Sequence, residues 1–168
     1  MSGREQDPLD AVQADRVRAV LALGGVPQGD LQDGLQQVRL KLLERRARGE
    51  EAPRDVGAWT AVVASNIAAD WHRARNRQER VATRLKLLNT RDAQVESGQE
   101  SSLLAMAVAE GLDALPDAQR QVLVLRYYAD LPVRRIAELL GVPVGTVKSR
   151  LFAAAKIMRE RLQKEEVA

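Results

Sequence analysis

The chain has 168 residues, which allows one ordinary domain or two small domains of about 70 residues each. Hydrophobic residues make up 45% of the chain but aromatic residues only 3%, and this balance favours helices packed on helices over sheets. The net charge is only +3, and the lack of cysteine excludes disulfides, thiol catalysis and cysteine-based metal sites. No apolar run approaches the ~20 residues of a membrane span, and residues 1–8 lack a signal-peptide core, so we expect a soluble cytoplasmic protein.

Three helices are predicted in the first half of the chain, each with an apolar stripe at helical spacing. Asp10 is placed to cap the first helix, over residues 10–23, and the glycines that follow end it. The second helix covers residues 31–46, and the third starts near residue 57 and runs into a basic stretch. The stripes consist of Val17, Val20 and Leu21, then Leu31, Leu35, Val38 and Leu42, then Trp59, Val62, Val63, Ile67 and Trp71.

A polar segment without a stripe, residues 90–102, separates these helices from a second helical block and is predicted to be a flexible tether. In the second block Pro116 starts a helix that is expected to turn Val122, Leu125 and Tyr128 inward. The fold class predicted is therefore all-α, with two small helical domains and a linker. The domain ranges are 10–78 and 102–164 with a linker at 79–101, and the helices of the second block cover 103–115, about 116–128, 133–140 and 144–163.

Residues 133–151 have the pattern of a helix-turn-helix. Two helices that meet near a right angle need a small residue where they cross, and Ala137 supplies it. The turn needs a residue that tolerates positive φ, which Gly141 does. The second helix needs a branched apolar residue that faces back into the angle, and Val147 fits that position. The alternative is a generic packing of three helices.

The last predicted helix has a buried stripe on one side and a polar, basic surface on the other. In a helix-turn-helix the start of this helix enters the major groove, where Lys and Arg contact guanine edges or phosphates. The outward-facing Phe152 suits a thymine methyl group or a partner, and a partly covered surface aromatic is the alternative. The stripe consists of Val144, Val147, Leu151, Ala155, Met158 and Leu162, and the candidate DNA contacts are Thr146, Lys148, Ser149, Arg150, Phe152 and Lys156.

Basic residues gather in two segments of the chain, although its positive and negative charges are nearly equal in number. Residues 73–91 hold seven basic residues and one acid, and residues 144–164 hold six basic residues and one acid. Two such clusters suggest two contacts with a polyanion, while two solvated helix faces are the alternative for each cluster alone. The first cluster supplies Arg73, Arg75, Arg77 and Arg80 as candidate contacts to a phosphate backbone.

The segment LDALPDAQRQVLVLRYYADLPVRRIAELLGVPVGTVKSRLFAAAKIMRERL resembles region four of bacterial RNA polymerase sigma factors, especially the extracytoplasmic-function (ECF) type. Residues 33–43 resemble the region-two helix that docks on the polymerase clamp. Residues 58–75 resemble the following helix, which engages the minus-ten element. The resemblance implies a protein that binds core polymerase at its clamp and flap, reads the minus-thirty-five duplex with region four and melts the minus-ten element with region two. It also implies an anti-sigma factor as a further partner, and no membrane insertion.

The resemblance implies that a flipped-out base enters a pocket at the loop of residues 49–56, with help from Asn66. Extrusion of a base costs a few kcal/mol of unstacking, which contacts in the pocket must return. Asn66 also lies beside the apolar stripe, where its amide needs a partner, either a base edge or a nearby backbone group.

In sigma factors of this family, acidic residues of region two contact basic residues of the polymerase clamp. Asp33 stands at one of these acidic positions. The resemblance assigns polymerase binding to Asp33, Gln36, Gln37 and Lys41. Without it, the polar stripe that Asp33, Gln37 and Lys41 form at a spacing of four residues would be an ordinary solvated face. Gln37 replaces a second usual acid, Arg39 replaces a usual large apolar residue, and Ala153 stands where many members carry a base-reading Arg. The stretch before Asp33 also lacks the family's usual aromatic-rich first helix.

Two alternatives to a sigma factor remain at the level of sequence. A stand-alone helix-turn-helix regulator would not dock on polymerase and would not need the match at residues 58–75. An enzyme lacks support, because His72 is the only histidine and no nucleophile–base pair or metal cluster is evident. We therefore expect no enzymatic activity, no cofactor and no metal.

Overall fold

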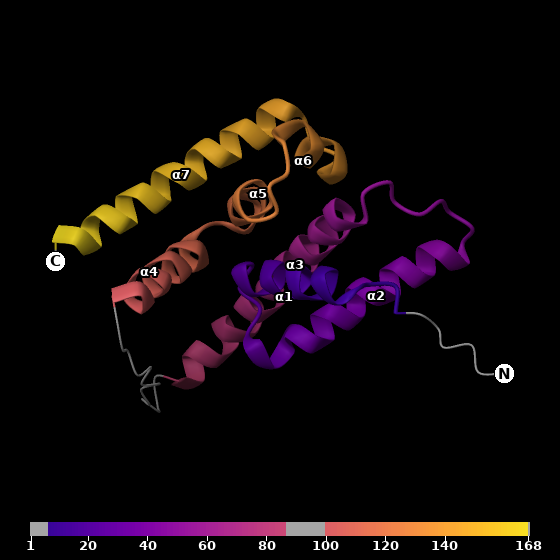
Figure 1. Cartoon of the computed structure of the whole chain (residues 1–168). Coiled ribbons are helices and arrows are strands. Elements are labelled where there is room, and N and C mark those ends of the chain that lie inside the picture. The colour runs from indigo at the N-terminus through magenta and orange to yellow at the C-terminus, as the bar shows by residue number, and fades with distance from the viewer. Residues whose placement is uncertain (1–6, 87–99, 168) are drawn as a thin grey trace.

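The computed structural model describes residues 7–86 and 100–167, apart from the side chains of residues 76–86, 100–102 and 165. Within these ranges the chain is helical, as the predicted all-α class requires (Figure 1). The elements are α1 (Ala11–Leu23), η1 (Gln28–Asp30), α2 (Leu31–Ala47), α3 (Val56–Lys86), α4 (Glu100–Ala114), α5 (Asp117–Tyr127), α6 (Val133–Leu140) and α7 (Val144–Val167).

The first three helices pack pairwise against one another and form the first unit of the molecule. Asp10 caps α1 as expected: its carboxylate accepts a hydrogen bond from the Gln13 N–H at 2.8 Å, and the Gln13 side chain accepts one from the Asp10 N–H at 3.1 Å. The predicted stripes of α1 and α2 form the centre of the unit, with Val17, Leu21 and Leu35 nearly inaccessible to solvent. On α3 the stripe is half buried at both tryptophans.

The last four helices form the second unit, in which α7 packs against α4, α5 and α6. Leu125, Ile136, Val147 and Ala154 are fully buried at its centre. None of the helices in the described ranges has the length and apolar character that a membrane crossing requires.

Two of the expected inward-facing residues of the second unit are in fact exposed. Tyr128 is 45% exposed, because α5 ends at Tyr127 and the chain leaves the direction of the stripe there. Val144 is 37% exposed, because it is the first residue of α7 and precedes the turn that packs on α6. On α7 the most deeply buried alanine is Ala154, whereas the stripe placed Ala155 inward.

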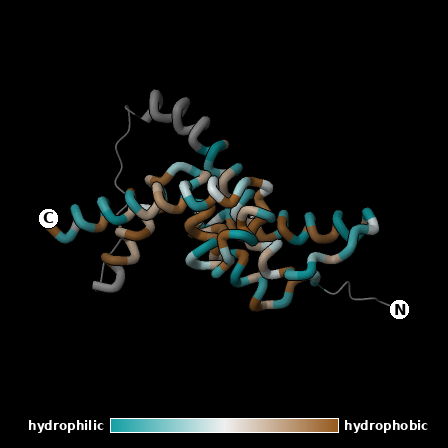
Figure 2. Tube along the Cα trace, turned by 90° about the horizontal axis from the view of Figure 1, so that it is seen from above, coloured by the Kyte–Doolittle hydropathy of each residue, from teal (hydrophilic) through white to brown (hydrophobic). Residues whose placement is uncertain are grey.

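The two units pack against each other rather than standing apart. Helix α3 contacts both α5 and α6, and α1 also contacts α5 (Figure 1). Viewed from above, hydrophobic residues gather where the helices of the two units meet, and the C-terminal end of α7 projects from this centre (Figure 2). Helix α3 continues to Lys86, although the linker was expected to begin at residue 79; residues 87–99 lie outside the described ranges.

Candidate nucleic-acid and partner interfaces

The exposed face of α7 carries the predicted duplex contacts. Lys148, Phe152 and Lys156 recur every four residues, so they project from one side of the helix, and all three are exposed. Phe152 is 76% exposed, an unusual state for a large apolar side chain. The Ser149 hydroxyl is exposed and donates to the Thr146 carbonyl at 3.1 Å, while Thr146 and Arg150 are half buried at the flanks of this face.

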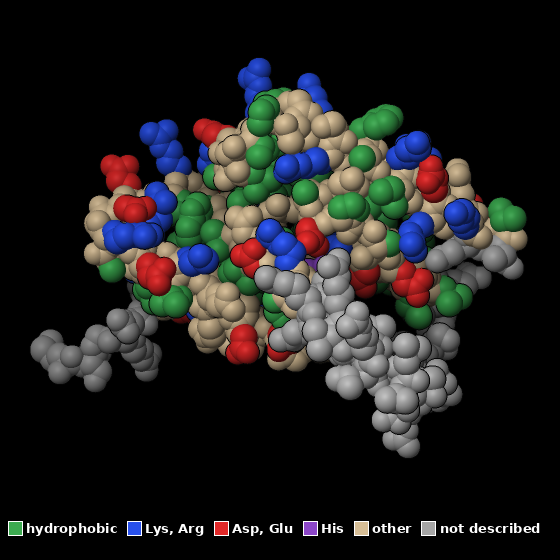
Figure 3. Space-filling view, turned by 180° about the vertical axis from the view of Figure 1, so that it is seen from behind, with side chains coloured by type: hydrophobic (Ala, Val, Ile, Leu, Met, Phe, Trp, Pro, Cys, Tyr) green, Lys and Arg blue, Asp and Glu red, His purple; other side chains and the backbone are tan. Residues whose placement is uncertain are grey.

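The turn between α6 and α7 sets the direction in which α7, and therefore its exposed face, leaves α6. Gly141 adopts the left-handed conformation at φ 68°, which glycine reaches without the strain that a Cβ would cause. The Val142 N–H then donates to the Ala137 carbonyl at 3.0 Å, and Val147 is fully buried against α6. The three residues predicted to define the helix-turn-helix therefore occupy the expected positions. The space-filling view shows basic side chains projecting from the edge where α6 and α7 lie (Figure 3).

A cleft of about 320 Å³ lies between α2 and α3. Asp33, Gln37 and Lys41 line it from α2, and Asp70 and Trp71 line it from α3. The structure thus brings three of the four predicted polymerase contacts to one wall. Gln36 is exposed but does not line the cleft.

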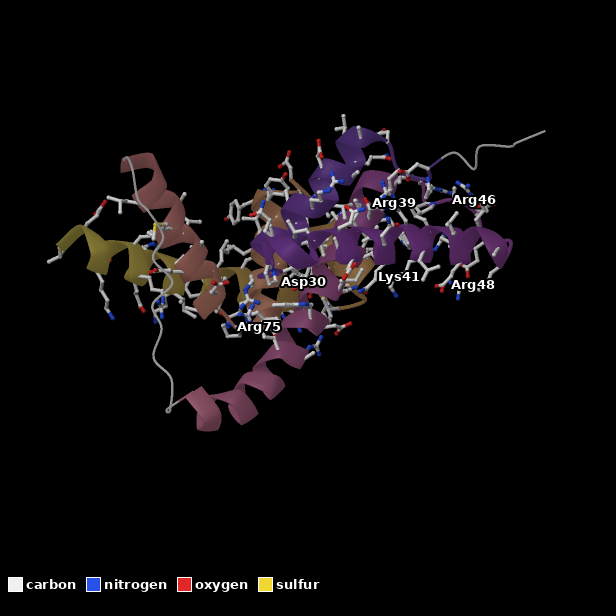
Figure 4. The ribbon with its side chains drawn as sticks, turned by 90° about the horizontal axis from the view of Figure 1, so that it is seen from below. Asp30, Arg39, Lys41, Arg46, Arg48 and Arg75 are labelled. Carbon is white, nitrogen blue, oxygen red and sulfur yellow. The ribbon has the colours of Figure 1, made fainter. Side chains whose placement is uncertain are left out.

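Arg39, which departs from the family pattern, contacts the segment that precedes α1. Its guanidinium donates to both oxygens of the Asp7 carboxylate, from Nε at 3.0 Å and from NH2 at 2.6 Å. The Leu9 N–H, also bonded to this carboxylate, and Arg39 both hold the pKa of Asp7 below its ordinary value. Arg39 on α2 therefore holds the segment around Asp7 that precedes α1 (Figure 4).

Asn66, predicted to help hold a base, already has a partner in the second unit. Its Oδ1 accepts a hydrogen bond from Gln121 Nε2 on α5 at 2.5 Å. The same Gln121 nitrogen lies 2.9 Å from the Ser65 hydroxyl oxygen. Asn66 also lies ten residues beyond the start of α3, which places it about 15 Å along the helix axis from the loop of residues 49–56. The structure therefore does not bring Asn66 and that loop together.

Further polar contacts join the two units near Asn66, and together with the Gln121 bonds we call them the seam. His72 Nδ1 lies 3.2 Å from Asp117 Oδ1, and the same carboxylate oxygen is 3.1 Å from NH1 of the buried Arg120. On the other side of the seam, the Arg16 guanidinium donates to the Ala129 carbonyl.

The basic stretch of α3 is only partly within the described side chains. Arg73 is exposed and pairs with Asp70 at 2.9 Å. The Arg75 guanidinium lies 5.1 Å from the centroid of the Trp71 ring, close to the cleft (Figure 4). Arg77 and Arg80 lie on α3, but their side chains are outside the described residues.

The loop between α2 and α3 is fixed at one end by backbone geometry and at the other by a side-chain cap. Gly49 adopts φ 72°, and the Gly49 and Glu50 N–H groups donate to the carbonyls of Arg46 and Arg45, which is the Schellman pattern that ends many helices. At the far end the Asp55 carboxylate accepts a hydrogen bond from the Ala58 N–H at 2.9 Å and caps α3.

Sequence reasoning missed the residues that hold these surfaces in place. Arg120 is 2% exposed and donates to the carbonyls of Leu112, Asp113 and Leu115 at the end of α4. Its position three residues after Asp117 of the L-P-D start, and just ahead of an apolar stripe, was the available signal, yet charged residues are rarely buried. Gln121 had no signal, because its partners are 55 and 56 residues away in the chain.

Comparison with families of known proteins places the helix-turn-helix in a defined group. Residues 105–158 match the family described as sigma-70, region 4. Over 138 residues the chain is 31% identical to the RNA polymerase sigma-E factor of Streptomyces antibioticus, an alignment that covers 82% of this chain and 73% of that protein. It is 26% identical over 152 residues to the ECF RNA polymerase sigma factor RpoE of Cereibacter sphaeroides, covering 89% and 81%.

A shorter match to the RNA polymerase sigma factor SigV of Bacillus subtilis is 36% identical over 74 residues and spans 45% of that protein. Two solved structures share the fold. The sigma factor RpoE, crystallised with the anti-sigma factor NepR from Bartonella quintana, has a TM-score of 0.66 at 18% identity and covers 90% of this chain and 92% of its own. CnrH in complex with the cytosolic domain of CnrY has a TM-score of 0.65 at 19% identity, covering 92% and 84%.

Proposed function

The chain belongs to the ECF class of RNA polymerase sigma factors, and from this premise we propose that it binds core RNA polymerase and directs transcription from specific promoters. The observation that carries the proposal is the 138-residue alignment at 31% identity, which extends well beyond the helix-turn-helix. A stand-alone regulator would need similarity in the second unit only. A sigma factor is an initiation factor that acts with the polymerase, so we expect no independent enzymatic activity and a cytoplasmic location.

We assign recognition of the minus-thirty-five duplex to the exposed face of α7. All six predicted contact residues fall inside the segment that matches sigma-70 region 4. Lys148 and Lys156 place positive charge at both ends of the face, and Phe152 offers an apolar group between them. This combination suits a duplex, whose phosphates attract the cations and whose thymine methyl groups lie in the major groove.

Polymerase binding is assigned to the cleft between α2 and α3. Asp33 and Asp70 face it from opposite walls, and Gln37 and Lys41 add neutral and basic groups along the α2 wall. The two acids are suited to receive a basic side chain of the polymerase clamp.

The minus-ten strand is assigned to the loop of residues 49–56, to Asn66 and to the arginines of α3. Asn66 is exposed, but its Oδ1 already accepts a hydrogen bond from Gln121, so use of this oxygen on DNA requires the Gln121 bond to open. The fold shared with two sigma factors solved in anti-sigma complexes supports a further proposal, that an anti-sigma factor binds this chain as well.

Run-off transcription with purified core polymerase on a genomic template library tests the proposed function. Addition of the chain should yield discrete transcripts that core polymerase alone does not make. A chain that binds duplex DNA but yields no such transcript, and is not retained by core polymerase, would be a stand-alone regulator instead.

A further inference from the structure

Arg45, near the end of α2, donates a hydrogen bond to a backbone carbonyl of the loop that follows this helix and also contacts a side chain there. Its Nε donates to the Glu51 carbonyl at 2.8 Å, and its NH1 lies 3.4 Å from the Glu50 carboxylate. The same guanidinium lies 6.0 Å from the centroid of the Trp59 ring on α3. One planar group therefore links α2, the loop and α3.

The contacts of Arg45 act on the middle of the loop, between its two fixed ends. The turn at Gly49 sets where the loop begins, and the Asp55 cap sets where it ends. Between them, Ala52 and Arg54 are exposed and Pro53 is half buried. The Arg45 bond to the Glu51 carbonyl is the contact that directs the chain from the turn toward this exposed segment.

Arg48 strengthens the same arrangement from the other side of the turn. Its Nε lies 3.0 Å from the second oxygen of the Glu50 carboxylate, so Glu50 is held between two guanidinium groups. Arg48 is 66% exposed, whereas Arg45 is 31% exposed and lies against the ring of Trp59. The half-buried, forked contact of Arg45 is the stronger constraint, because solvent screens the more exposed ion pair of Arg48.

We propose that Arg45 is a positioning residue that presets the loop of residues 49–56 and thereby determines how selectively the chain accepts its minus-ten base. This inference rests on the proposed function, which places a flipped-out base at that loop. A pocket that must return the cost of base extrusion discriminates well only if its walls are already in place. A lysine cannot replace Arg45, because a single ammonium lacks the planar fork that reaches the carbonyl and the carboxylate together.

The test compares Arg45→Ala, Arg45→Lys and Arg46→Ala in run-off transcription from a promoter that the wild-type chain uses. Each variant is assayed on that promoter and on a copy with the flipped base replaced, and the ratio of the two transcripts measures selectivity. Because the ratio is taken within each variant, partial loss of folded protein cancels. Arg46→Ala is the matched control, since Arg46 is exposed, carries the same charge and leaves α2 on the side opposite Arg48 (Figure 4).

We expect Arg45→Ala to lower the ratio about tenfold, in keeping with the loss of a charge-assisted hydrogen bond and its packing. Arg45→Lys should keep the salt dependence of promoter binding but show the same loss of selectivity. In parallel, tryptic cleavage after Arg54 should become about fivefold faster in Arg45→Ala than in Arg46→Ala, because the exposed segment is released.

Selectivity that stays at the wild-type ratio in Arg45→Ala, or that Arg45→Lys restores, would overturn the positioning role and leave Arg45 as a charge near the DNA. A wild-type chain that gives no promoter-dependent transcript would overturn the proposed function itself, and this inference with it.

Discussion

Phe152 stands out among the side chains of α7 because it is large, apolar and 76% exposed. Its truncation in Phe152→Ala should change the free energy of unfolding by less than about 0.5 kcal/mol, since it removes no buried contact. Affinity for the minus-thirty-five duplex should nevertheless fall about tenfold, because an apolar contact with a base edge is lost. Fluorescence anisotropy with a labelled duplex measures the affinity.

The matched control for Phe152 is Tyr127→Ala on α5, which also truncates an aromatic side chain that is 72% exposed. It should leave duplex affinity unchanged. Equal effects of both substitutions would show that α7 has no special part in duplex binding.

Asp33 gives the corresponding prediction for the cleft between α2 and α3. Asp33→Arg places a third cation-bearing side chain near Lys41 and Arg75 and should weaken retention on immobilised core polymerase about tenfold or more. Duplex binding should be unaffected, because α7 is in the other unit. Asp15→Arg makes the same reversal of charge on α1, at a side chain 79% exposed, and should not change retention. Equal losses in the two variants would mean that net charge, not the cleft, determines polymerase binding.

At the scale of the element, the turn between α6 and α7 sets the direction in which α7 leaves the core. Gly141 has open space around the position of a Cβ, so Gly141→Ala introduces backbone strain without a clash. We expect a loss of about 1–2 kcal/mol of stability in thermal or urea unfolding, the cost of a left-handed alanine. Gly145 also has open space but lies in the first turn of α7, so Gly145→Ala should be neutral or stabilising. A destabilisation of similar size in both variants would contradict this account of the turn.

The positions of the helices could be predicted from sequence because an apolar stripe fixes which face of a helix is buried. Val17, Leu35 and Val147 are buried as their spacing requires, and Ala137 and Gly141 stand where a helix-turn-helix needs them. The apolar spacing predicted burial wrongly at helix ends, as at Val144 and Tyr128, because helical spacing no longer determines there which way a side chain points.

What the sequence did not predict are the polar contacts that depend on how separate elements meet. Arg45 and Arg120 each resemble ordinary surface arginines until the loop and the end of α4 are placed beside them. The pairing of Gln121 with Asn66 depends on the packing of α5 on α3, for which neither helix carries a local pattern.

At the scale of the whole molecule, the seam occupies the Asn66 Oδ1, one of the groups assigned to the minus-ten strand. Gln121→Ala removes two hydrogen bonds to α3, to Ser65 and to Asn66. Only the Asn66 bond occupies an atom assigned to DNA, so affinity for a single-stranded minus-ten oligonucleotide should rise about fivefold, the equivalent of one bond of about 1 kcal/mol. Filter binding or anisotropy measures the change. Gln163→Ala removes an exposed side chain from the far part of α7 and serves as the control. Unchanged affinity in Gln121→Ala would mean that the seam does not compete with DNA.

The seam joins two parts of one chain, and this has a consequence for how the protein responds to its own abundance. The balance between joined and separated units is unimolecular, so synthesis of more protein leaves the joined fraction unchanged. An inhibitor supplied as a separate molecule can be exhausted when its target is produced in excess. Under the proposed role of Asn66, restraint by the Gln121 and Asp117 contacts would be present in every copy of the protein, and raising its amount would not lower the restrained fraction.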